Sequence, residues 1–141
     1  MLLDEIAYHL QTNSIGTIAS TAANGIYKAF MPHAPATCTV LYEYTGQAPQ
    51  QRFSSSTPAY EIPHFQIVCR STSYATARTK AHSIFKLLNG VVSQTIKPSS
   101  GATGCTYFSI EPNQSPFDMG KDENDYMRVA CNYAAKKNLS T

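Results

Sequence analysis

Hydrophobic and polar positions follow two different periods between residues 61 and 88. Over residues 65–70 they alternate, which is typical of a strand with one buried face. Pro63 precedes this strand, at a place where a missing N–H costs no ladder hydrogen bond. Over residues 74–88, hydrophobic positions recur every three or four residues and form one stripe along a helix. The segment therefore predicts a strand followed by a long helix.

The same patterns predict the other elements. A hydrophobic stripe over residues 2–10 predicts a first helix that ends before Gly16. Alternation or β-forming composition predicts further strands at residues 26–30, 37–44, 91–96, 105–110 and 127–133. Residues 45–60 and 111–125 have no period and contain prolines and glycines. Connections this long usually indicate function or disorder, and for residues 45–60 a functional loop and a flexible hairpin both remain open.

The order of these elements predicts an α+β fold. We expect a mixed, largely antiparallel sheet with two helices packed on one face, because several links between strands have hairpin length. A chain of 141 residues can bury a core of its own, which favours a single domain. We expect that domain to span residues 1–135, followed by a polar C-terminal tail at residues 136–141.

Charge is sparse and unevenly distributed. Only 14% of the residues are charged and the net charge is +2, which is too small to predict strong nucleic-acid binding. The low charge favours association with other subunits. Residues 111–125 contain five acidic residues against Lys121 alone, so the rest of the chain is basic. This asymmetry fits subunits that meet through opposite potentials, although a solvated acidic loop is the simpler interpretation.

Motifs for catalysis or metal binding are missing from the sequence. The four cysteines lie far apart without CxxC spacing and are interpreted as small buried residues, with a disulfide or a zinc site as alternatives. The four histidines fall on separate predicted elements, and no phosphate-binding glycine motif leads into a helix. No apolar run reaches the length of a membrane span. We therefore expect a cytoplasmic protein with no catalytic, cofactor-binding or metal-binding residues, no cofactor and no membrane association.

Spaced residues in the first two thirds of the chain resemble the minor capsid or tail terminator proteins of long-tailed bacteriophages. The resemblance covers residues 2–90. The residues concerned are Phe30, Met31, Pro32 and Pro35; Leu41, Tyr42, Glu43, Tyr44, Thr45 and Gly46 with Pro49; Glu61, Ile62 and Pro63 leading to Gln66 and Arg70; and Tyr74 and Ala77 in the predicted helix.

The resemblance implies a structural, non-enzymatic virion protein of the tail or neck, assembled in the host cytoplasm. Such proteins form a homo-oligomeric ring, typically a hexamer, on the last ring of the tail tube protein. The ring stops tube polymerisation and offers a surface to the head–tail connector protein, while DNA passes through its lumen without specific binding. There are two alternatives. One is a head-side connector or stopper subunit, and the other is a small cytoplasmic α+β enzyme or ligand-binding domain.

A closed ring of one subunit needs two unlike patches that meet between neighbours. Arginine and aromatic residues are over-represented at interface cores, and acidic residues supply opposite potential. We therefore predict a candidate assembly interface at Gln51, Arg52, Phe53, Asp118, Asp122, Glu123 and Asp125. We also hypothesise that residues 47–56 are mobile in the free subunit and become ordered on assembly.

Overall fold

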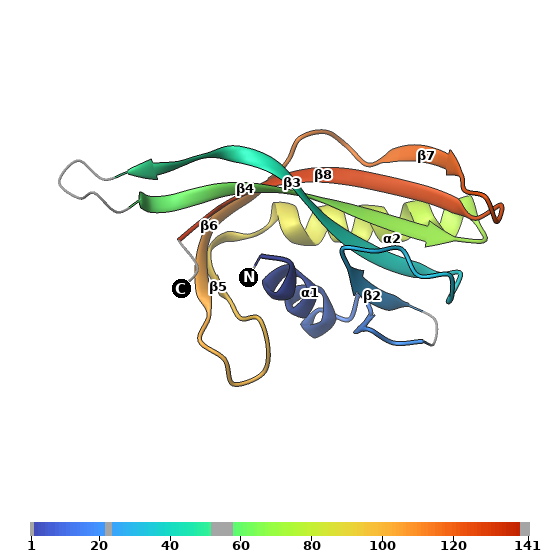
Figure 1. The fold of residues 1–141 in the computed structure, drawn as a ribbon, viewed down its shortest axis with the longest axis horizontal. Helices are drawn as coiled ribbons and strands as arrows, with labels where there is room; N and C mark the ends of the chain where they lie inside the picture. Colours follow the sequence, from blue (N-terminus) through green and yellow to red (C-terminus); the bar gives the residue numbers. More distant parts are fainter. Residues whose placement is uncertain (1, 22–23, 52–57, 139–141) are drawn as a thin grey trace.

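An eight-stranded sheet forms most of the computed structural model of this protein, which describes residues 2–21, 24–51 and 58–138 (Figure 1). The strands are β1 (Thr17–Ile18), β2 (Gly25–Lys28), β3 (Cys38–Gln51), β4 (Pro58–Ser71), β5 (Val92–Ile96), β6 (Cys105–Pro112), β7 (Phe117–Lys121) and β8 (Met127–Lys137). They lie in the order β1-β2-β3-β4-β8-β6-β5, and β7 also pairs with β8. The β1–β2 and β2–β3 pairs are parallel, and the other pairs are antiparallel.

Two helices complete the core. Helix α2 (Tyr74–Asn89) buries the predicted stripe against β4, β6 and β8, with Ala77, Ala81, Ile84 and Leu88 inside. Helix α1 (Leu2–Thr12) contacts β1, β2 and β3 and also β5. One hydrophobic cluster joins both helices to the sheet. Neither helix in the described ranges is long and apolar enough to cross a membrane.

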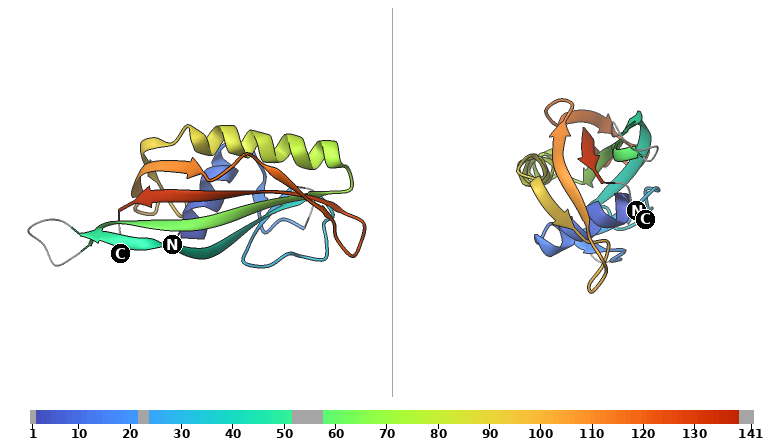
Figure 2. Two further views of the ribbon diagram at one scale, coloured as in Figure 1. Left: turned by 90° about the horizontal axis from the view of Figure 1, so that it is seen from above. Right: turned by 90° about the vertical axis from the view of Figure 1, so that its left-hand side faces the viewer.

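The contacts of α1 show that the sheet is curled. β1 and β5 stand at opposite ends of the strand order, and a single three-turn helix touches strands at both ends. Figure 2, viewed along the long axis, shows the sheet as a half-barrel. The prediction of an α+β sheet with two helices packed on one face is therefore wrong. The hydrophobic stripes identified the buried side of each helix, but they could not reveal how far long twisted strands curl.

The curled sheet contains strands that extend beyond the segments in which hydrophobic and polar residues alternate. Residues 45–51 and 58–60 were assigned to a loop, but they extend β3 and β4 to 14 residues each. Backbone pairing continues along this extension, with register shifts after Tyr44, Gln47 and Gln50. At Gly46 the two strands approach so closely that a Cβ would lie 2.4 Å from the Ile62 carbonyl oxygen. Bulges of this kind bend a hairpin and increase its twist.

Two other boundaries also differ from the prediction. Residues 117–121, placed in a polar loop, form β7, which pairs with the first half of β8. Strand β8 continues into the expected polar tail, and the side chain of Lys137 is fully buried. The end of α2 agrees with the prediction: the helix ends at Asn89, and its C-cap Gly90 has a φ of −86°.

The segment between β2 and β3 crosses the outer face of the sheet. Because β2 and β3 are parallel, residues 29–37 must return the chain to the starting end of the sheet. A second, smaller hydrophobic cluster of Tyr27, Cys38 and Val40 lies beneath this segment, with Met31 and Tyr42 packed against it. The crossing segment therefore lies against the outer face near the end of β4.

Candidate assembly surface

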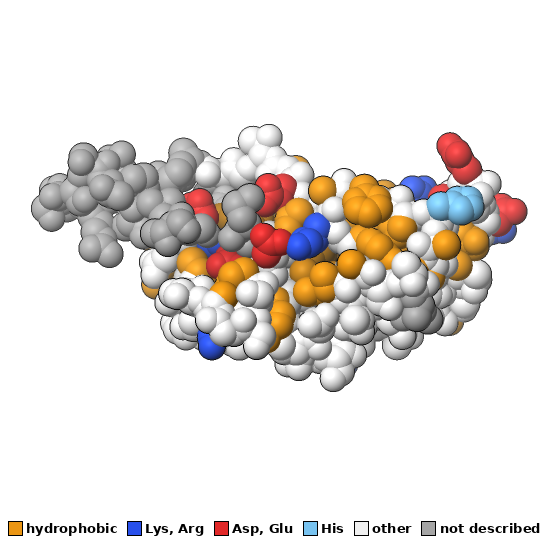
Figure 3. All heavy atoms as spheres, turned by 60° about the horizontal axis from the view of Figure 1, so that its bottom comes forward, with side chains coloured by type: hydrophobic (Ala, Val, Ile, Leu, Met, Phe, Trp, Pro, Cys, Tyr) orange, Lys and Arg blue, Asp and Glu red, His pale blue; other side chains and the backbone are white. Residues whose placement is uncertain are grey.

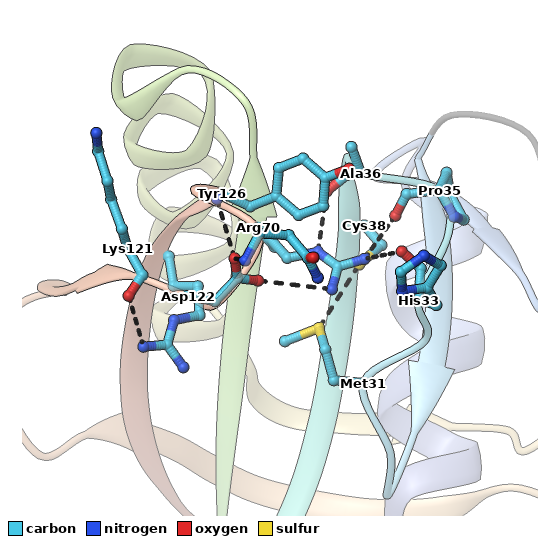
Figure 4. Close-up of polar contacts among 11 residues, drawn as sticks. Met31, His33, Pro35, Ala36, Cys38, Arg70, Lys121, Asp122 and Tyr126 are labelled. Atoms are coloured by element: carbon cyan, nitrogen blue, oxygen red, sulfur yellow. Dashed lines mark hydrogen bonds and ion pairs between the residues drawn. The ribbon is translucent and has the colours of Figure 1, made fainter.

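Arg70 fixes the crossing segment at one end of the molecule. It is the penultimate residue of β4 and only 2% exposed. Its Nε donates to the carbonyl oxygen of Ala36 at 3.1 Å, and its Nη2 donates to those of Pro35 at 2.7 Å and His33 at 3.4 Å (Figure 4). Carbonyls of a segment outside the strands need donors, and the guanidinium supplies several in one plane. Arg70 thus supplies the hydrogen-bond donors that a neighbouring strand would otherwise provide to residues 33–36.

The turn between β7 and β8 closes over the same guanidinium. Oδ2 of Asp122 lies 3.9 Å from Nη1 of Arg70, and the ring of Tyr126 lies 5.1 Å from Cζ (Figure 4). The N–H groups of Asn124 and Tyr126 each donate to Oδ1 of Asp122 at 2.9 Å. Desolvation opposes the charged carboxylate, but these two hydrogen bonds and the charges of Arg70 and Arg128 outweigh it and lower the pKa of Asp122. Two separate loops are therefore joined through one buried charge.

A cleft of about 700 Å³ opens between these two loops. It is lined by Met31, Pro32, His33, Arg70, Lys121, Asp122, Glu123, Asn124 and Arg128. Arg128 donates to the carbonyls of Met119 and Lys121, at 3.4 Å each. The lining includes no serine, threonine or cysteine that could act as a nucleophile beside His33. The chemistry of the cleft is that of a charged, rigid surface.

The four acidic candidate residues have two different roles. Asp118 accepts a hydrogen bond from the N–H of Gly120 at 2.8 Å and holds a bend in β7. Asp122 is engaged by Arg70 and by its own turn, as described above. Glu123 and Asp125 are exposed at the tip of the turn, and Asp125 has a left-handed φ of 62°. Of the predicted acidic set, Asp118, Glu123 and Asp125 are exposed, and Glu123 and Asp125 stand at the tip of the turn.

The far end of β3 lies at the opposite end of the molecule from the acidic turn (Figure 1). Gln51 ends β3 and pairs with Pro58. Arg52 and Phe53 lie outside the described residues. The mobility hypothesis for residues 47–56 falls partly on β3 and partly outside the described residues. Among the described residues, the structure therefore separates Gln51 from the four acidic candidates.

Sequence patterns missed the buried charged residues. Arg70 was expected on the polar face of a half-buried strand, and Lys137 in a solvated tail. Lys137 instead lies 2.5 Å from Oε1 of Glu5 and 3.7 Å from Oε1 of Glu61, while the Tyr107 hydroxyl donates to Glu5 at 2.9 Å. No local pattern signals such a cluster, because its members are up to 132 residues apart.

The cysteines and histidines form no reactive group in the part of the chain that the structure describes. All four cysteines are free, and Cys38, Cys69 and Cys131 are buried. Burial raises the pKa of Cys69 to about 12, so its thiol stays protonated. Within residues 2–21, 24–51 and 58–138, no three His, Cys, Asp or Glu side chains are placed to hold a metal ion.

Comparison with known proteins identifies the family. A sequence model described as "Bacteriophage tail terminator protein" matches residues 9–139. The chain belongs to this family. The resemblance seen in the sequence is therefore confirmed, and the chain is a structural component of phage tails and of the virion. Three of the residues that carried the resemblance, Met31, Pro35 and Arg70, meet in the junction described above.

Solved structures share the fold of this tail terminator family member. A chain from the "Virion of native gene transfer agent (GTA) particle" is 18% identical, with a TM-score of 0.57. The match covers 98% of this chain and 95% of that one. A second solved structure is 12% identical, with a TM-score of 0.55 over 99% of this chain and 96% of its own. No curated protein sequence matches this chain.

Proposed function

We propose that this chain is the tail terminator subunit of its phage. In this role it assembles as a closed ring, typically of six copies, on the last ring of the tail tube. The ring ends tube polymerisation and offers a surface to the head–tail connector protein. The observation that carries the proposal is the family match over residues 9–139, which takes in all eight strands and all of α2.

The elongated shape gives the proposed subunit two chemically different ends. One end is the β3–β4 hairpin, and the other holds the Arg70 junction and the acidic turn (Figure 1). Figure 3 shows acidic side chains, basic side chains and a histidine gathered at the right-hand end, with hydrophobic side chains over the middle of that face. We place the long axis along the tail, so that one end faces the tube and the other faces the connector.

The Arg70 junction suits a docking end because it is rigid. Backbone carbonyls from one loop and a carboxylate from another are held by the same buried guanidinium. A surface that is already ordered loses less conformational freedom when a partner binds. Phe30, at the start of the crossing segment, is 59% exposed and rests edge-on against Tyr27. An exposed aromatic side chain on an ordered segment is typical of an interface anchor.

Transit of DNA through the proposed ring is compatible with the charges. The net charge of +2 gives little drive for tight phosphate binding. Lys137, one of the few lysines near the C-terminus, is fully buried and paired with Glu5, so it is not available to a phosphate. The lumen would then guide the genome without holding it.

Deleting the gene in its phage tests the proposal directly. We expect overlong tails without attached heads, because nothing would stop tube growth or join the connector. Wild-type gene supplied from a plasmid should restore normal length. Tails of normal length that carry heads, in the deletion strain, would contradict a terminator role. Normal-length tails without heads would favour the head-side connector or stopper role instead.

A charge reversal tests the acidic turn as a docking surface. Glu123→Lys changes an exposed residue at the tip of the turn and should weaken attachment to whichever partner this end contacts. Glu111→Lys makes the same charge change at another exposed position and serves as the control. Complementation of the deletion strain by each variant is the measurement. Equal head-joined particle yields from the two variants would remove the acidic turn from the proposed interface.

A further inference from the structure

The sheet consists of two halves with different edges. β2 ends at Lys28, opposite Leu41 of β3, and β7 pairs only with residues 127–130 of β8. The half that carries the hairpin is therefore five-stranded, in the order β3-β4-β8-β6-β5. Its two lateral edges are β5 on one side and the distal half of β3, beyond Leu41, on the other.

The β5 edge is open and unprotected. Among the described residues, β5 pairs with β6 alone, and four of its five residues are exposed. Val92 is 69% exposed, and the strand contains no charged residue and no proline. Natural proteins usually protect a free edge with lysine, proline or a covering segment, because its unpaired N–H and C=O groups attract another strand. An edge left without these features is suited to receiving a strand.

The distal half of β3 offers a second open edge. Beyond Leu41, within the ranges that the structure describes, β3 pairs with β4 alone. Residues 43–47 are exposed, and Glu43 is the only charged residue among them. Pro49 lacks an N–H, so residues 42–47 form the part of this edge that can pair on both hydrogen-bonding groups.

The directions of the two edges fit rotation symmetry. Each step from β3 to β4, β8, β6 and β5 is antiparallel, so four reversals leave β3 and β5 pointing the same way. Rotation about an axis along the strands preserves that direction in every copy of a ring. The geometry points to a contact in which β5 of one subunit pairs in parallel with residues 42–47 of β3 of the next. This inference rests on the ring proposed above.

The contact is heterologous, and it closes. One edge of each copy meets the other edge of its neighbour, which is the arrangement that a cyclic ring requires. Irregular backbone keeps the pairing short: Ser93 in β5 has a left-handed φ of 48°, and β3 shifts register after Tyr44. A short ladder is weak by itself, so the closed ring, in which every copy makes two such contacts, is favoured over open chains. Repetition of the contact gives one continuous sheet around the ring.

Hydrogen exchange on the full-length chain, free and assembled into rings alone or on tail tubes, tests the contact. We expect the amides of residues 92–96 and 42–47 to exchange about tenfold more slowly, or slower still, in the ring. Amides of the exposed face of α2 provide the internal control, because they should not change. Rings in which residues 92–96 and 42–47 keep their free exchange rates would overturn the inference and leave the proposed function standing.

Cysteine cross-linking tests the partner and the direction. Chains carrying Val92→Cys or Thr95→Cys are mixed with chains carrying Tyr44→Cys or Gln47→Cys, all at surface positions, and oxidised. Disulfides form when Cα atoms lie about 4.4–6.8 Å apart. The wild-type chain, with Cys105 half-buried, gives the background. We expect unlike pairs to cross-link, with Val92→Cys favouring Tyr44→Cys and Thr95→Cys favouring Gln47→Cys, because the strands are parallel.

Each other outcome contradicts a definite part of the argument. The opposite preference, or links between two β5 variants, would show antiparallel pairing and overturn the inference. If rings form alone, protection of residues 92–96 that appears only after tail tubes are added to those rings would show that the tube protein covers this edge, which also overturns it. If no ring forms alone or on tubes, the proposed function fails together with the inference.

Discussion

The buried Lys137 cluster allows the sharpest test of how this fold is held together. The Lys137 side chain at the end of β8 is fully buried and contacts Glu5 of α1, which is 3% exposed. Tyr107 donates to the same carboxylate oxygen. Lys137→Met removes the cation and keeps most of the volume. It leaves the Glu5 carboxylate buried with one hydroxyl partner and no close cation at that oxygen.

The expected cost follows from that unpaired charge. Removing one partner of a buried ion pair typically destabilises a protein by about 3–5 kcal/mol. For a chain of this length, each kcal/mol lowers Tm by about 2–4 °C, so we expect a fall of about 6–20 °C. The double variant Glu5→Gln/Lys137→Met keeps an acceptor for Tyr107 and removes both charges. It should recover most of the loss, because replacing both charged partners is often nearly neutral.

Urea unfolding followed by circular dichroism gives these free energies. Lys136→Met is the matched control: its ammonium lies 4.4 Å from the Tyr60 ring centroid at a half-buried position, so it should cost about 1 kcal/mol or less. A loss below about 1 kcal/mol for Lys137→Met would refute the reasoning. So would a double variant no more stable than the single one, because the cost would then come from packing and not from charge.

Three further predictions concern single sites. Arg70→Met should destabilise the chain by about 3 kcal/mol in urea unfolding, because several carbonyls lose a buried donor, whereas exposed Lys86→Met should change stability by less than about 0.5 kcal/mol. Gly46→Ala should lower Tm through its clash with β4, whereas Gly90→Ala, with 3.5 Å of clearance, should leave Tm unchanged or raise it. Burial lowers the pKa of His9 below its usual 6.5, so the unfolded chain binds the proton at a higher pH than the folded chain does. The free energy of unfolding should therefore fall as the pH drops from 7 to 5. His9→Leu should flatten this dependence, and an unchanged slope would contradict the prediction.

Local patterns were reliable where one face of an element is buried and the other is wet. Helix α2 spans Tyr74–Asn89 against a predicted 74–88, and the strand predicted at 65–70 lies within β4. The pattern failed where strand pairing continues through residues without hydrophobic alternation. Residues 45–51 have no hydrophobic alternation, yet they extend β3 because β4 runs beside them. Propensity cannot report a partner that supplies only N–H and C=O groups.

The candidate site shows the same division. The spaced prolines and Arg70 were visible in the sequence and led to the right family, and the acidic residues were visible as a separate cluster. Their grouping was not visible in the sequence. The backbone carbonyls that Arg70 contacts, in residues 33–36, precede it by at least 34 positions, and Asp122 follows it by 52 positions. The acidic turn and the hairpin residues looked like two loops of one interface, but β3 ends at the opposite end of the molecule from the acidic turn.

The sequence by itself determined which residues alternate or recur, and therefore where both helices and most of the strands begin. These features depend on neighbours a few residues apart, whose spacing is fixed by helix and strand geometry. Only the tertiary structure decided the curl of the sheet, the burial of Arg70, Glu5 and Lys137, and the two open edges at β3 and β5. Each of these depends on which distant strand becomes a neighbour, and that choice is made by the packing of the whole chain.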